Sequence, residues 1–188
     1  MTMSHAKIQK MCAAALLCAI GILIPMISPI KIAIGPMSFT LASHVAIFMA
    51  MFISPAVAAV VSVGTTLGFL LAGFPPVVVV RAASQLVFLL IGAFLLRQKP
   101  NAFQTPARIF ALGAGLSVIH AVGEMLVVTA FLFAGVPLGG TVTSVLFGLV
   151  GVGTFVHSMI DFALALLVWA PVSRAVKMPI AFRYVRKA

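Results

Sequence analysis

The residues of this 188-residue chain that could carry chemistry are few, and most lie at helical spacing inside apolar segments. The chain has two acidic residues, Glu124 and Asp161, and each follows a histidine by four positions, at His120 and His157. Residues four apart share one face of a helix, so each pair would point its ionisable groups in one direction. Such groups can hydrogen-bond between helices, contact a ligand or relay protons.

A third pair at the same spacing combines a cation with an amide, Arg81 with Gln85. An ionisable group near the centre of a membrane helix costs at least about 2.5–3.5 kcal/mol, so it normally faces the protein interior and finds a partner. Counted at about 1.5 Å per residue from the expected outer helix ends, Arg81 would lie nearest to the outside. We interpret it as an anchor for an anion; the alternatives are a side chain that reaches the outer headgroups and a packing salt bridge to Glu124.

Further polar residues gather toward the same expected outer side. Together they predict an outward-facing pocket of cationic character, suited to a small anion with hydroxyl, amide or ring groups. The two histidine–acid pairs have interhelical hydrogen bonding as the alternative to ligand contact. The candidate ligand-binding residues are Lys31, Ser38, Thr40, His44, Arg81, Gln85, His120, Glu124 and His157.

Several enzymatic signatures are absent from the sequence. It has no phosphate-binding loop, no zinc-protease motif and no nucleophile elbow, and its sole aspartate offers no catalytic dyad. We therefore expect no enzyme, no metal and no cofactor.

The composition indicates which elements must position these side chains. About 63% of the residues are hydrophobic and 7% are charged, against about 25% charged in a soluble domain. Each membrane crossing needs about 20 residues, so the length allows six and leaves nothing for a soluble domain. We predict an all-α integral membrane protein with one domain over residues 1–188. The predicted spans are about 8–27, 38–53, 56–73, 76–96, 107–134 and 143–171.

Basic residues set the expected orientation. Ten of the twelve lysines and arginines lie before the first span, in the segment 97–108 and in the tail from Arg174 onward. By the positive-inside rule these three regions are cytoplasmic, so both termini are inside. This distribution argues against nucleic acid as a partner. A separate cluster, Gly148, Gly151 and Gly153, predicts an unwound or kinked start to the last span.

Two small residues, Ala15 and Ala19, share one face of the first span and would allow another helix to approach closely. Together with the six-span length, the basic inner ends and the lack of an ATPase motif, they make the chain resemble the S components of energy-coupling-factor (ECF) vitamin transporters. The resemblance covers essentially the whole chain. The stretch 38–55 is similar to the branch that handles pantothenate or niacin.

The resemblance implies a multi-pass protein of the bacterial cell membrane that captures a vitamin from outside, with the first outer loop as a lid. It also implies docking onto a transmembrane scaffold subunit, to which Ala15 and Ala19 match the contact motif, and ATP hydrolysis by two cytoplasmic partner subunits. Pantothenate is slightly favoured over niacin as cargo. Niacin would use the cation and an aromatic wall such as Phe39, Phe69 or Phe74.

Two other functions stay open at this point. In a stand-alone proton-coupled secondary transporter of a small organic anion, Glu124 or Asp161 would titrate during transport. In a non-transporting assembly subunit, the polar pairs would only join helices.

Overall fold

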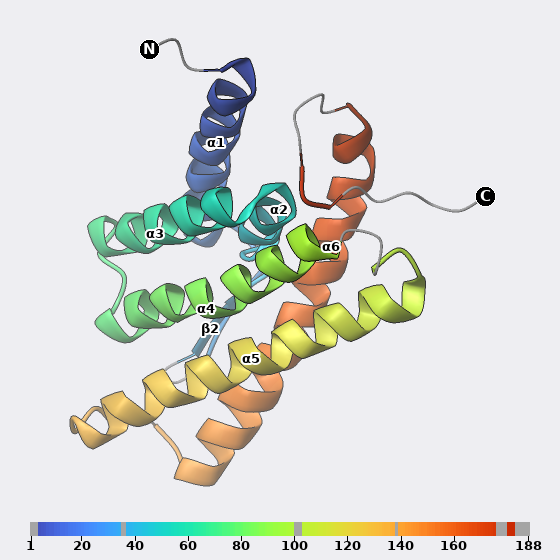
Figure 1. The fold of residues 1–188 in the computed structure, drawn as a ribbon. Helices are drawn as coiled ribbons and strands as arrows, with labels where there is room; N and C mark the ends of the chain where they lie inside the picture. The colour runs from blue at the N-terminus through green and yellow to red at the C-terminus, as the bar shows by residue number, and fades with distance from the viewer. Residues whose placement is uncertain (1–3, 35–36, 100–102, 138, 176–179, 183–188) are drawn as a thin grey trace.

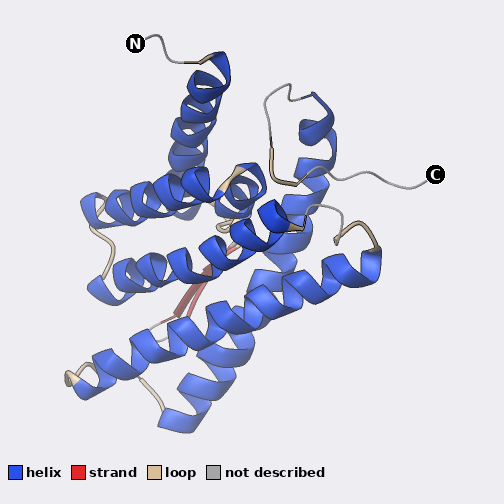
Figure 2. Cartoon of the chain, viewed as in Figure 1, coloured by secondary structure: helices blue, strands red, loops and turns tan. Residues whose placement is uncertain are grey.

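The computed structural model describes residues 4–34, 37–99, 103–137, 139–175 and 180–182, with the backbone alone for 31–34, 37 and 38. Helices dominate it, and one short hairpin lies between them (Figures 1 and 2). The elements are α1 (His5–Ile27), β1 (Lys31–Ile34), β2 (Met37–Thr40), α2 (Val45–Ile53), α3 (Pro55–Leu71), α4 (Pro76–Gln98), α5 (Pro106–Phe133), the π-helix η1 (Ser144–Val152) and α6 (Gly153–Ala175).

The lengths and surfaces of the helices are those of a membrane protein. Among the described residues, four helical segments are long and apolar enough to cross a bilayer: α1, α4, α5 and the continuous stretch of η1 with α6. Helix α3 is apolar but shorter, with 17 residues. Large apolar side chains such as Leu71 and Phe133 point outward and are more than 80% exposed. An outer surface this apolar is suited to contact with lipid.

The turn between α2 and α3 forms where the sequence predicts it. The Ser54 hydroxyl accepts a hydrogen bond from the amide of Val57, and Pro55 takes the first helical position, where its missing N–H costs nothing. The next turn closes at Gly73, whose φ of +76° suits glycine. The two helices on either side of each turn therefore lie next to each other (Figure 1).

The predicted second span, 38–53, is wrong in its first part. Residues 31–34 and 37–40 pair as an antiparallel hairpin, with Lys31 opposite Thr40 and Ile34 opposite Met37. Helix α2 begins only at Val45. Its nine residues span about 14 Å, less than half of the roughly 30 Å of hydrocarbon. The two strands satisfy part of each other's backbone hydrogen bonding.

Helix α2 forms the centre of the apolar core. Eight of its nine residues are buried, and it contacts α1, α3, α4 and α6. Its far end is covered by the returning end of the chain: the amides of Ala181 and Phe182 donate to the carbonyls of Ile53 and Phe52 at 3.0 Å. The indole N–H of Trp169 donates to the Phe182 carbonyl at 2.8 Å. The last carbonyls of a helix need partners, and these contacts supply two of them.

The last long helical segment starts irregularly, as the glycine cluster predicts. Residues 144–152 form the π-helix η1, which widens the turn and includes Gly148 and Gly151. Regular α-helix resumes at Gly153. The end of α6 and the start of α1 lie on the same side of the bundle, at the top of Figure 1.

Candidate ligand-binding site

A cavity of about 50 Å³ lies where the hairpin meets the helices. Polar side chains from five elements and their flanking turns reach it, together with three phenylalanine rings. Its polar lining consists of Thr40, Ser43, His44, Thr65, Arg81, Gln85, Glu124, Thr154 and His157. Its aromatic lining consists of Phe39, Phe69 and Phe74, the three residues proposed from the sequence as an aromatic wall.

A buried ion pair forms one wall of the cavity. Arg81 Nη2 lies 2.8 Å from Glu124 Oε2, and the two residues are 6% and 3% exposed. The Thr154 hydroxyl donates to the same carboxylate oxygen at 2.6 Å, and His120 Nε2 lies 3.3 Å from the other oxygen. Arg81 therefore does not reach the outer headgroups. It makes the salt bridge to Glu124 that the sequence left open as an alternative, and it also lines the cavity.

His44 connects two helices through its two ring nitrogens. Nδ1 lies 3.0 Å from Asp161 Oδ2 on α6, and Nε2 lies 3.0 Å from the amide nitrogen of Gln85 on α4. A carboxylate can only accept, so Nδ1 carries the proton, and in the neutral ring Nε2 then accepts from the Gln85 amide. The cavity thus presents an imidazole whose tautomer is fixed from both sides.

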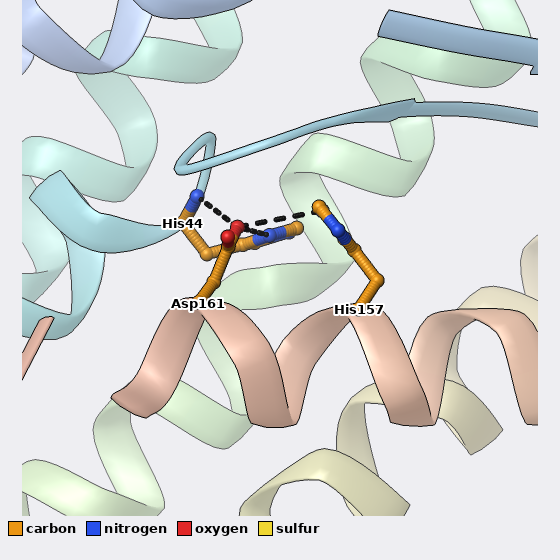
Figure 3. A group of neighbouring side chains, drawn as sticks. All are labelled: His44, His157 and Asp161. Carbon is orange, nitrogen blue, oxygen red and sulfur yellow. Dashed lines mark hydrogen bonds and ion pairs between the residues drawn. The ribbon is translucent and has the colours of Figure 1, made fainter. Parts of the chain in front are cut away.

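Asp161 anchors the turn between the hairpin and α2. Its Oδ1 accepts the backbone N–H of Ala42 at 2.8 Å, and its Oδ2 accepts that of His44 at 2.9 Å. Ala42 has a φ of +67°, a conformation that costs a non-glycine residue free energy and persists only where its surroundings hold it. Figure 3 shows the contacts of this carboxylate with His44 and with His157, whose Nε2 lies 3.4 Å away.

The ligand atoms of His44, His157 and Asp161 all lie within 4.8 Å of one another, a grouping that could hold a metal ion. Both oxygens of Asp161, however, already accept backbone N–H groups. The Ser43 hydroxyl also lies 3.1 Å from His157 Nε2. A cation would have to compete with these donors, so the arrangement fits a hydrogen-bonded cluster better than a metal centre.

Phe39 of the hairpin closes one side of the cavity. Its ring centre lies 5.4 Å from that of His157. A side-chain carbon at Gly153 would lie 2.8 Å from the end of the Phe39 ring, closer than real carbons approach. The hairpin therefore sits on α6 at a place where the helix has no side chain. Across the cavity, Phe69 and Phe74 stack with ring centres 4.8 Å apart.

Comparison with known proteins assigns the family. The niacin transporter NiaX of Lactococcus lactis is 43% identical over 164 residues, which cover 86% of this chain and 73% of that protein. The chain belongs to the niacin-type branch of the ECF S components. No family model matches the chain, and no solved structure does.

Membership in this branch confirms the resemblance predicted from the sequence. The S component is a multi-pass protein of the bacterial cell membrane and a substrate-binding subunit rather than an enzyme. The relative is named for niacin, so the comparison does not support the predicted preference for pantothenate.

Most of the predicted contact residues of the S component do come together. His120 is the exception: it is buried, bonds to Ser158 at 3.1 Å and is not among the described residues that line the cavity. The side chains of Lys31 and Ser38 lie outside the described residues. The predicted residues that do line the cavity are Thr40, His44, Arg81, Gln85, Glu124 and His157.

Three hydroxyl residues at the cavity, Ser43, Thr65 and Thr154, were not among the predicted contacts. Hydroxyl side chains in membrane helices usually bond to their own backbone, so their presence alone carries little signal. Thr154 could have been found, since it precedes His157 by three positions and so shares its helix face.

Ala15 and Ala19 are both exposed on α1 of the S component, so their shared face is not used within the bundle. Ala15 also borders an apolar groove of about 480 Å³ between α1 and the start of α3, near Lys7 and Lys10. Another helix could reach this face.

Proposed function

We propose that this S component binds niacin from outside the cell and delivers it for ATP-driven import by an ECF complex. The observation that carries the proposal is a buried arginine facing a small cavity that is also lined by phenylalanine rings. The name of the relative from Lactococcus lactis supports the same cargo. Niacin is a flat ring with one carboxylate, and these two kinds of side chain suit its two parts.

The carboxylate of niacin would bind at Arg81. A guanidinium presents five N–H donors in a plane and can face more than one carboxylate. Phe39 would cover the ring from the hairpin, while Phe69 and Phe74 would border it from α3 and the turn that follows. His44 and Gln85 complete the polar side of the site.

The size of the cavity supports a compact ligand. One water molecule needs roughly 10–15 Å³ of such space, so about 50 Å³ holds only a few. A small aromatic acid requires less expansion of this site than an extended amide acid such as pantothenate. The hairpin is the element that would have to move to admit either ligand, because Phe39 lies over the cavity.

Delivery would follow the arrangement that the family implies. Six spans with both termini cytoplasmic would place the start of α1 and the end of α6 on one side, and in Figure 1 they lie on one side. The exposed face with Ala15 and Ala19 would contact the transmembrane scaffold subunit, which joins two cytoplasmic ATPases. The whole chain, 1–188, would act as one domain.

Equilibrium binding with the purified protein tests the cargo. Labelled nicotinate should bind, and excess pantothenate should not displace it. Arg81→Gln should weaken nicotinate binding at least about a hundredfold, because a buried charge-assisted pair is lost. Arg97→Gln, at the exposed end of α4, is the matched control and should bind normally.

Two results would contradict the proposal. Tight pantothenate binding without nicotinate binding would reject the cargo, and full affinity in a folded Arg81→Gln protein would reject the anchor. Uptake by vesicles that contain this chain alone, driven by a proton gradient, would instead favour a stand-alone carrier.

A further inference from the structure

Thr65, which lines the cavity from α3, has a buried hydroxyl without a partner among the described residues. Thr65 is 4% exposed and lines the cavity, and its Oγ1 has no hydrogen-bond partner among the described residues. Leaving a buried hydroxyl unbonded costs free energy, so such groups are rare and call for an explanation.

The neighbouring threonine shows what Thr65 does not do. Thr66 donates its hydroxyl to the carbonyl of Ser62 one turn earlier at 2.9 Å, and Thr129 on α5 bonds the carbonyl of Met125 at 2.7 Å. This contact with the preceding turn is the usual way for threonine to satisfy itself in an apolar helix. The Thr65 hydroxyl is turned away from that bond.

Helix α1 leaves room for the Thr65 hydroxyl but provides no hydrogen-bond partner for it. Gly21 of α1 faces Thr65, and a side-chain carbon there would lie 2.9 Å from Thr65 Oγ1. Since α1 has no side chain here and Thr65 lines the cavity, a ligand in the cavity is the group that would supply the missing partner.

Other polar groups around the cavity are already engaged. The Thr154 hydroxyl donates to Glu124, the Gln85 amide faces His44, and the Ser43 hydroxyl faces His157. Thr65 therefore has a donor to offer to a ligand without breaking an existing contact.

We propose that Thr65 donates a hydrogen bond to the ring nitrogen of a pyridine carboxylate whose acid group is held at Arg81. The inference rests on the proposed function. It adds the contact by which the site would distinguish a pyridine ring from a benzene ring. The pyridine nitrogen is an acceptor in the plane of the ring, and a hydroxyl can donate to it. Recognition would then come from two helices, with α4 binding the acid and α3 reading the ring.

The test compares nicotinate with benzoate, which has the same carboxylate and ring shape but no ring nitrogen. Both ligands are titrated into the purified full-length protein and into Thr65→Val, which keeps the branched shape and removes the hydroxyl. Nicotinate affinity should fall about tenfold, the factor expected of one neutral hydrogen bond. Benzoate affinity should stay unchanged, and Thr65→Ser should keep most of the preference for nicotinate.

Ser62→Ala is the matched control. Ser62 lies on the same helix, is equally buried and also lacks a partner, but it is not among the described residues that line the cavity. Its variant should bind both ligands normally. Unchanged nicotinate affinity in Thr65→Val, or an equal loss for both ligands, would overturn the inference while leaving the proposed function standing. Absence of nicotinate binding by the unmodified protein would overturn both.

Discussion

Asp161 Oδ2 lies 3.0 Å from Nδ1 of His44, and this contact joins two residues that are 117 positions apart in the chain. The same carboxylate holds the backbone N–H groups of Ala42 and His44. One buried side chain of α6 therefore fixes both the orientation of a cavity imidazole and the turn by which the hairpin enters α2.

Asp161→Asn should loosen the turn between β2 and α2. The amide side chain has one oxygen to offer in place of two charged ones, so at least one backbone N–H would lose its partner. Hydrogen bonds to charged groups contribute about 1.5–3 kcal/mol each, so the melting temperature should fall by several degrees. Hydrogen exchange should become faster at the amides of Ala42 and His44. Unchanged exchange at both amides would show that Asp161 does not hold this turn.

Gly153→Ala should disturb the contact between the hairpin and α6. The added methyl group would lie 2.8 Å from the ring of Phe39, so the ring must move away from α6. Nicotinate affinity and thermal stability should both fall. Gly148→Ala is the control, because a methyl group there meets nothing within 4 Å.

Shortening the facing side chain provides a further check on this contact. Phe39→Leu combined with Gly153→Ala should recover thermal stability relative to Gly153→Ala alone. Equal losses in the Gly148 and Gly153 variants would point to an effect on the helix itself instead of the hairpin.

Ala15→Trp and Ala19→Trp should separate binding from transport. Both residues are exposed on α1, away from the cavity, so nicotinate affinity should be unchanged. Uptake by cells that supply the scaffold and ATPases should be lost, because a large ring prevents close helix approach. Leu16→Trp, on another exposed part of α1, is the control and should transport normally. Loss of binding together with uptake would indicate misfolding, and normal uptake would reject the contact face.

Much of the site could be predicted because helical spacing carries its signal. The pairs that begin at Arg81, His120 and His157 mark three helix faces, and the structure brings residues of all three together. His120 was predicted to line the cavity, but it is not among the described residues that do. A count of residues along the helix gives the depth in the membrane but not the direction in which the side chain points. Thr65 was not chosen as a contact, because whether a hydroxyl is satisfied depends on its three-dimensional surroundings.

The hairpin was missed because the apolar run 45–53, typical of a membrane helix, was extended back to Ser38 to reach a spanning length. The alternation of Met37, Ser38, Phe39 and Thr40 suits a strand, but four residues are too few to outweigh the apolar run that follows. Pairing with residues 31–34, which decides the conformation, depends on a second segment across a turn.

The return of the chain at Ala181 and Phe182 has a practical consequence for recombinant versions of this protein. Cutting the sequence before these residues would leave the carbonyls of Phe52 and Ile53 and the indole of Trp169 without their partners. A purification tag joined directly to Phe182 would place foreign sequence next to the two residues that bond to the end of α2. Tags are therefore better placed at the other terminus, or separated from Phe182 by a spacer.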